Sequence, residues 1–290
     1  MLIYILVGTV AGLHSSCWGG YKDSPYEPFI TLKYIRSIIV GSICGLIVPA
    51  LLNLHGYKEI NLALLFCFII AIERVFTETL KAFFREESQE KYNIPTKFHY
   101  LGKVINNKIL RIFIGAGFLA LLYGLFCIPE IYGNFINNHF LVCIFWGAMS
   151  GLASSLGGMW KDAPIEGFDI IKFPRSFIFG GIWGAIFSPL VSSEYSLLFY
   201  ASIGSERMAV EFYKTFIAGG PSSKFKVKEP VYPDWLIKRR ILIFPYAVTW
   251  ITFLGLLIPS LIKSIQHLAI CYQHLIGLLL NMLVTSQLLS

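Results

Sequence analysis

Apolar residues along this chain form long runs that are separated by short polar segments. Nine of these runs approach the roughly 20 residues that a helix needs to cross a bilayer. The predicted spans are residues 2–20, 36–54, 60–84, 108–130, 139–159, 175–192, 195–217, 240–262 and 266–288. Charged residues collect between the runs or near their ends. The pattern therefore predicts an all-α, polytopic helical membrane protein.

Composition narrows the class further. Of the 290 residues, 56% are hydrophobic and 14% are charged, whereas a soluble domain carries about 25% charged residues. The mean hydropathy is +0.65. A large soluble core is disfavoured because so little polar surface would remain to cover it. The 6 cysteines are scattered without a CxxC motif or a Cys/His cluster, so the sequence predicts neither a disulfide framework nor a zinc site. It implies no cofactor and leaves other metal binding open.

One charged motif occurs twice. Residues 19–37 read GGYKDSPYEPFITLKYIRS, and residues 158–176 read GMWKDAPIEGFDIIKFPRS. The separation is constant, since Lys22 to Lys161 and Arg36 to Arg175 both span 139 positions. The charged residues shared by the two copies are Lys22, Asp23, Glu27, Lys33 and Arg36, and Lys161, Asp162, Glu166, Lys172 and Arg175. Ten charges retained in an apolar chain indicate an internal repeat and a candidate working site.

A second motif, Glu-Arg-x3-Glu-x2-Lys, also occurs twice, in the third and the seventh predicted spans. Its members are Glu73, Arg74, Glu78 and Lys81, and Glu206, Arg207, Glu211 and Lys214. The two motifs together predict tandem four-helix repeats in parallel orientation, at residues 1–132 and 139–263. A ninth helix at residues 264–290 has no counterpart. Lipid would make such charges costly, so they should face protein or a water-filled cavity.

Glycines recur at four-residue spacing in both repeats. They are Gly8, Gly12, Gly41 and Gly45 in the first repeat, and Gly147, Gly151, Gly180 and Gly184 in the second. Such glycines let two helix backbones approach. Packing within one chain is a commoner role for them than a dimer interface or a permeation path.

Lysine and arginine distribution predicts the topology. The loops after spans 1, 3, 5 and 7 are rich in basic residues, whereas those after spans 2, 4 and 6 contain only Lys58. The positive-inside rule then places the N-terminus outside and the basic loops in the cytoplasm, near anionic lipid headgroups. The short first and sixth spans could instead be re-entrant, which would invert the repeats, but the charge asymmetry favours full crossings. The formal charge of +7 is spread among the loops, so nucleic acid is not an expected partner.

The repeated loop motif allows several roles. Asp23 and Glu27, four apart with a proline between them, could converge on a cation, or they could pair with Arg36 or Arg74 to hold the bundle together. Lys33 and Arg36, three apart on one helix face, could bind a phosphate or carboxylate or reach the headgroups. The simplest assembly places each loop against the Glu-Arg helix of its own repeat.

Three function classes remain open. The favoured one is a transporter or channel for an ion or small charged solute, in which Glu73 and Glu206 bind an ion or proton while Arg74 and Arg207 tune their pKa or bind an anion. A membrane enzyme acting on a lipid phosphate is the second. It is disfavoured because HExxH, GxSxG and P-loop motifs are absent from the sequence. The third is a structural or assembly subunit whose charges form ion-pair networks, within an oligomer or a complex.

Overall fold

A computed structural model of the chain is mostly helical, with 76% helix and 2% strand. It describes residues 1–133, 135–168, 170, 172–218, 224–227 and 229–288, and it describes the side chains of these residues except 172 and 267–288. The main helices are α1 (Leu2–Asp23), α2 (Thr31–Leu54), α3 (Leu62–Thr79), α4 (Lys108–Tyr132), α5 (His139–Glu166), α6 (Lys172–Phe187), α7 (Tyr195–Phe212) and α9 (Ile243–Leu288). The short elements are η1 (Leu80–Phe84), β1 (His99–Tyr100), β2 (Lys103–Val104), η2 (Ser188–Leu190), η3 (Tyr213–Ile217), α8 (Trp235–Lys238) and η4 (Arg239–Leu242).

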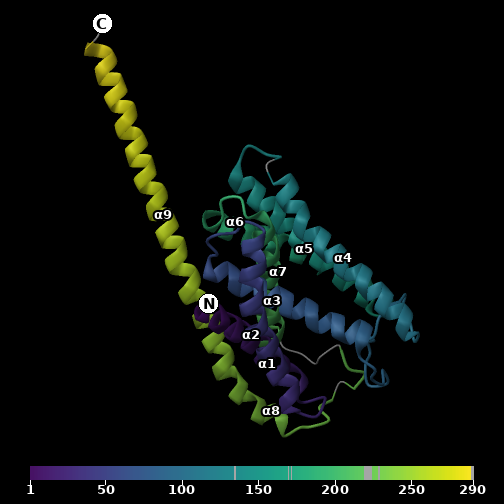
Figure 1. The fold of residues 1–290 in the computed structure, drawn as a ribbon. Coiled ribbons are helices and arrows are strands. Elements are labelled where there is room, and N and C mark those ends of the chain that lie inside the picture. Colours follow the sequence, from purple (N-terminus) through teal and green to yellow (C-terminus); the bar gives the residue numbers. More distant parts are fainter. Residues whose placement is uncertain (134, 169, 171, 219–223, 228, 289–290) are drawn as a thin grey trace.

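Five helical segments of the described chain are long and apolar enough to cross a membrane. They are α1, α2, α4, α5 and the stretch Trp235–Gln266, which runs from α8 into α9. The helices α3 and α7 are only 18 residues long and each contains three charged side chains, while α6 has 16 residues. Two separate spans were predicted for residues 240–262 and 266–288, but α9 is a single helix of 46 residues whose C-terminal part projects beyond the bundle (Figure 1).

The centre of the bundle is formed by α3 and α7 (Figure 1). Leu64 and Leu65 of α3 and Leu198 of α7 are fully buried. The two helices touch at Gly204, where a Cβ atom would overlap the backbone carbonyl oxygen of Cys67. Both helices are apolar around most of their circumference, which is the pattern of a helix surrounded by protein. Both also end in a five-residue π-helical turn, η1 after α3 and η3 after α7.

Two tightly packed helix pairs flank this centre, α1 with α2 and α5 with α6. In the first pair, a Cβ on Gly12 would overlap the Ser37 carbonyl oxygen and lie 2.9 Å from the Cα of Ile38. In the second, a Cβ on Gly151 would overlap the Ser176 carbonyl oxygen and lie 2.9 Å from the Cα of Phe177. The spaced glycines therefore pack helices within one chain, because only glycine leaves room for such a close approach.

The helices α1, α3, α5 and α7 leave the bundle at the same end. The Trp18 indole of α1 donates a 2.9 Å hydrogen bond to Thr215 in η3, and Lys161 of α5 forms a 3.1 Å ion pair with Glu78 of α3. We call this the charged end of the bundle, defined by the C-terminal ends of these four helices. At the opposite end, Glu130 of α4 accepts hydrogen bonds from the Tyr57 hydroxyl and from the backbone N–H of Ser196.

The helices α4 and α9 each pack against the third helix of the other sequence copy. The Tyr200 hydroxyl of α7 donates a 2.6 Å hydrogen bond to the Leu122 carbonyl of α4. Phe253 of α9 stacks on Phe66 of α3, with ring centroids 5.7 Å apart, and α9 also packs against α1. These contacts interlock the two halves of the chain.

A polar connector, residues 85–107, joins η1 to α4 at the charged end. It contains the β1–β2 hairpin, whose turn places Leu101 and Gly102 at positive φ. The connector is fixed to α4 by Arg111, whose buried guanidinium donates to the carbonyls of Ile105 (3.0 Å) and Asn106 (3.2 Å) and pairs with Glu86. A backbone bridge links Tyr92 of the connector to Phe225.

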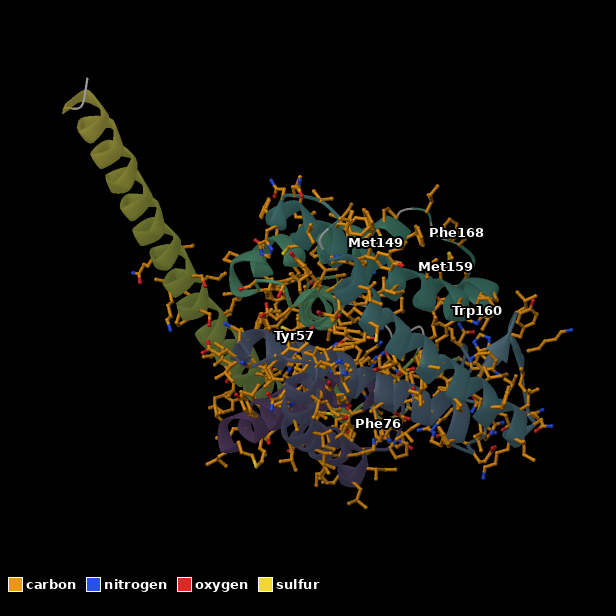
Figure 2. All side chains as sticks on the ribbon, turned by 45° about the horizontal axis from the view of Figure 1, so that its top comes forward. Tyr57, Phe76, Met149, Met159, Trp160 and Phe168 are labelled. Atoms are coloured by element: carbon orange, nitrogen blue, oxygen red, sulfur yellow. The ribbon has the colours of Figure 1, made fainter. Side chains whose placement is uncertain are left out.

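The outer surface of the bundle is apolar over much of its area. Large exposed side chains on the outer helices include Ile39 and Ile43 of α2, Phe113 and Leu121 of α4, and Ile182 of α6. Figure 2 also places Trp160 and Phe168 at the periphery, where they are 55% and 58% exposed. Exposed apolar surface of this extent marks a face that contacts lipid or protein.

Candidate functional site

Glu206, near the middle of the bundle, is a buried carboxylate with two serine partners. Its side chain is 0% exposed and lies about 16 Å along α7 at 1.5 Å per residue. The Ser176 hydroxyl of α6 donates a 2.6 Å hydrogen bond to one carboxylate oxygen, and the Ser154 hydroxyl of α5 donates a 3.4 Å bond to the other. The carboxylate thus fills the junction between α7 and the α5–α6 pair.

Glu73 occupies the corresponding position in the first copy. It is 2% exposed and lies about 16 Å along α3 by the same count. The hydroxyls of Ser37 in α2 and Ser15 in α1 approach its carboxylate. Ser15 and Ser37 match Ser154 and Ser176 at the same 139-residue separation as the charged loop. Buried carboxylates require such hydrogen-bond donors because an unsatisfied charge inside a protein is costly.

These serines are the functional candidates that the sequence reasoning missed. Their recurrence was visible in the repeat, but serine is common in membrane helices and no spacing rule connected α1 and α2 to a glutamate on α3. The packing supplies that connection, since the close glycine contact of Gly151 is with the carbonyl oxygen of Ser176 itself. Glycine spacing and serine placement therefore belong to one arrangement.

The remaining charges of α3 form an ion-pair cluster at the charged end. Glu78 accepts from Lys81 at 3.0 Å and from Lys161 at 3.1 Å, and it lies 3.7 Å from Arg74. Because Lys161 belongs to α5, this contact joins the second loop motif to the third helix of the first copy. The expectation that each loop lies against the Glu-Arg helix of its own repeat is wrong for Lys161. The physical reason is the central α3–α7 contact, which brings the end of α5 beside α3.

A related arrangement surrounds Trp18, at the end of α1. The Lys22 ammonium and the Arg74 guanidinium lie over its ring, 5.0 Å and 5.7 Å from the centroid. Lys22 is attracted by Glu211 on α7 and repelled by Arg74 on α3, so the end of α1 lies near the third helices of both copies. In the second copy, the ammonium of Lys214 is repelled by the positive charges of Arg175 and Arg207.

Lysines from two distant segments hold the first loop motif. Asp23 pairs with Lys224 at 2.6 Å. Glu27, only 2% exposed, pairs with Lys33, with Lys91 at 3.5 Å and with Lys224 at 3.6 Å. The predicted partners, Arg36 and Arg74, do not pair with these two carboxylates in the described part of the chain. Lys91 and Lys224 have no counterpart in the sequence repeat, which is why the motif did not reveal them.

The second loop motif differs from the first in local structure. The helix α5 continues through Pro164 and ends at Glu166, whereas α1 stops at Asp23. A proline in this motif favours a turn over a continuing helix, but Pro164 does not end α5, so that expectation fails for the second copy. Asp162 is half-buried, Glu166 is exposed and Arg175 is half-buried on α6. The side chain of Lys172 lies outside the described residues.

We expect acid to weaken the contacts of the first loop. Burial raises the pKa of Glu27, but the attraction of Lys224 and Lys33 outweighs it, so the net pKa lies below the ordinary value of 4.5. A depressed carboxylate pKa adds stability above the unfolded pKa, and this stability is lost as the pH falls through the folded value. The thermal unfolding temperature in detergent should therefore fall as the pH drops below 4.5.

The variant Glu27→Gln isolates this contribution. It should lower the unfolding temperature at neutral pH and flatten the acid dependence, because glutamine cannot titrate. Glu90→Gln, which alters an exposed carboxylate of the connector at residues 85–107, is the matched control and should keep the parental profile. An unchanged acid profile in Glu27→Gln would show that other groups control the transition.

Comparisons of the chain with protein-family models, with curated proteins and with solved structures give no match. The class is therefore defined by the structure alone. It is a helical protein with five described segments suited to cross a membrane. Among the described residues, its most deeply buried acidic side chains are those of Glu206, Glu73 and Glu27.

Proposed function

We propose that this chain is a multi-pass membrane transporter or channel for an ion or small charged solute. The observation that carries the proposal is the pair of buried carboxylates, Glu73 and Glu206, each set between two serine hydroxyls. A carboxylate and two hydroxyls offer hard oxygen ligands for a small cation, and the carboxylate alone takes a proton. Ionisable groups inside membrane helices typically mark ion pathways or proton relays.

The two sequence copies act as parallel repeats in this proposal, related by an axis along the membrane normal. The common direction of α1, α3, α5 and α7 supports that relation, as do the matching glycine contacts at Gly12 and Gly151. The charged end lies in the cytoplasm, because it holds most of the basic loop residues. The ion-pair cluster around Glu78 then has a structural role, coupling the two repeats through Lys161.

Flux measurements test the proposal. In proteoliposomes that contain the purified protein, imposed gradients of protons, sodium and potassium should produce a flux that a dye inside the vesicles reports. The double variant Glu73→Gln/Glu206→Gln should reduce this flux at least tenfold, since an amide neither carries a proton nor supplies a negative ligand. The variant should still elute as a folded species in detergent, because glutamine can accept the same serine hydrogen bonds.

Two controls make the result specific. Glu59→Gln removes an exposed carboxylate at the opposite end and should leave the flux unchanged. Ser176→Ala keeps the charge of Glu206 but removes its shortest hydrogen bond, and it should slow the flux less than Glu206→Gln does. Undiminished flux in the double variant, or the absence of any flux in the parental protein, would overturn the proposal.

A further inference from the structure

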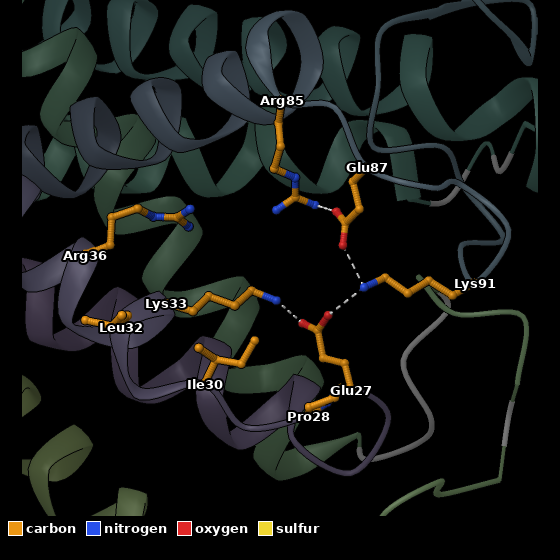
Figure 3. A pocket seen from close by; sticks show the side chains of 9 residues that line it. All are labelled: Glu27, Pro28, Ile30, Leu32, Lys33, Arg36, Arg85, Glu87 and Lys91. Atoms are coloured by element: carbon orange, nitrogen blue, oxygen red, sulfur yellow. Dashed lines mark hydrogen bonds and ion pairs between the residues drawn. The ribbon is translucent and has the colours of Figure 1, made fainter.

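A cavity of about 440 Å³ opens at the charged end, between the first loop, the start of α2 and the connector (Figure 3). Its lining includes four basic side chains, those of Lys33, Arg36, Arg85 and Lys91, and two carboxylates, those of Glu27 and Glu87. The volume lies within the range of small-molecule sites. The residues come from two stretches far apart in the sequence, 27–36 and 85–91, so the cavity exists only in the folded chain.

The charges of the cavity do not balance. Glu27 pairs with Lys33 and with Lys91, while Glu87 pairs with Arg85 and, at 2.7 Å, with Lys91. Two carboxylates therefore face four cations, and two positive charges remain. A surplus of two positive charges around one cavity attracts an anion. A phosphate monoester, which carries close to two negative charges at neutral pH, would balance them.

Arg36 supplies the donor geometry that such an anion requires. Its Nε atom is buried and finds no hydrogen-bond partner among the described residues. Its side chain also has no ion pair with the other lining residues drawn in Figure 3. The planar guanidinium presents a fork of donors that matches two phosphate oxygens. The α2 helix also begins here, at Thr31, without a side-chain cap at Ile30. Uncapped N–H groups at a helix start favour a bound anion.

The apolar part of the cavity indicates where the phosphate comes from. Ile30 and Leu32 line the same cavity, yet they are 53% and 77% exposed. They adjoin the outer face of α2, where Ile35 and Ile39 are also exposed. A charged cavity bordered by outward-facing aliphatic side chains suits a headgroup with its acyl chains attached.

We propose that this cavity is a binding site for a phosphate monoester headgroup of a membrane lipid, with Arg36 as its main ligand. The site does not depend on the transport proposal, because it shares no residue with the Glu73 or Glu206 sites. Lipid and soluble phosphate monoesters have the same recognition chemistry at Arg36, Arg85 and Lys91. They differ at Ile30 and Leu32, which only a lipid would use.

Binding of short-chain lipids to the detergent-solubilised protein tests the charge requirement. Short-chain phosphatidic acid, a monoester, should bind at least tenfold more tightly than phosphatidylglycerol with the same acyl chains, which is a diester of one charge. Arg36→Gln should weaken phosphatidic acid binding roughly tenfold, because a bidentate charge-assisted contact is lost. Arg240→Gln is the matched control, since Arg240 is an exposed arginine at the same end, and it should leave the affinity unchanged.

A second arm distinguishes the two sources of phosphate. Leu32→Ser should weaken phosphatidic acid binding but leave competition by inorganic phosphate unaltered. Inorganic phosphate that competes as well as the lipid, together with an unaffected Leu32→Ser variant, would overturn the lipid assignment. Equal affinity for the monoester and the diester, or an Arg36→Gln variant that binds like Arg240→Gln, would overturn the site itself. Arg36→Lys retains the charge without the fork, and it should fall between the parental protein and Arg36→Gln if the site is correct.

Discussion

Replacing Gly151 by alanine should keep α5 and α6 apart and leave little folded protein. A Cβ at this position would overlap the carbonyl oxygen of Ser176 and lie 2.9 Å from the Cα of Phe177. Both are backbone atoms, so no side-chain rotation can relieve the overlap, and one helix must move. Overpacking of a tight interface commonly costs about 1–3 kcal/mol, and we expect about 3 kcal/mol or more because the contact is between two backbones.

The same helix provides a matched control. Nothing lies within 4 Å of a Cβ placed on Gly158, so Gly158→Ala should be neutral or should stabilise α5 by about 0.5–1 kcal/mol through helix propensity. Thermal unfolding in detergent and the recovered yield of monodisperse protein measure the difference. A Gly151→Ala variant as stable as Gly158→Ala would show that the two helices have room to separate.

Glycine spacing predicted close helix packing within the chain, although it did not say which helices would pair. The four-residue intervals at Gly147 and Gly180, repeated at Gly8 and Gly41, indicated close packing within the chain, and the backbone contacts confirm that role. Helical class was also predictable, because hydrophobic runs of this length leave few alternatives. These features are local or periodic, which is why sequence alone reveals them.

Contacts between the two copies were not predictable in the same way. The repeat showed that Lys161 and Lys22 are equivalent, but it contained no information on which third helix each would face. That choice depends on the α3–α7 contact at Gly204 and Cys67, which has no sequence period. The continuity of α9 past residue 263 was also not predicted. The polar residues between the two apolar runs, 240–262 and 266–288, were taken as the boundary between two helices.

Departures from the repeat proved as informative as the repeat. Lys91 and Lys224 pair with Glu27, and Lys91 also lines the proposed phosphate site together with Arg85. Arg85 and Lys91 lie in the connector of the first copy and Lys224 lies in the connector of the second, and none of the three belongs to a repeated motif. The matched features therefore build the interior of the bundle, while the unmatched connectors create a different surface at the charged end of the first copy.

Arg111→Met should detach that connector from α4. The Arg111 side chain is 0% exposed, and it joins the carbonyls of Ile105 and Asn106 to the Glu86 carboxylate. Methionine has similar length but no donors, so the two carbonyls would lose their partner. Breaking a buried charged contact costs about 3–5 kcal/mol, and we expect the lower limit because Glu86 is half exposed and keeps Lys97 at 2.6 Å.

Lys108→Met, one turn earlier in α4, tests whether the effect is local. Lys108 is exposed, and a surface substitution of this kind usually changes stability by less than about 0.5 kcal/mol. Chymotrypsin should cleave after Tyr92 or Phe98 faster in Arg111→Met than in Lys108→Met, and the unfolding temperature should fall only in the former. Equal cleavage would mean that the Phe83–Phe98 stack holds the connector without Arg111. Because the connector supplies Arg85 and Lys91 to the cavity, Arg111→Met should also weaken phosphatidic acid binding, although Arg111 lies outside the cavity lining.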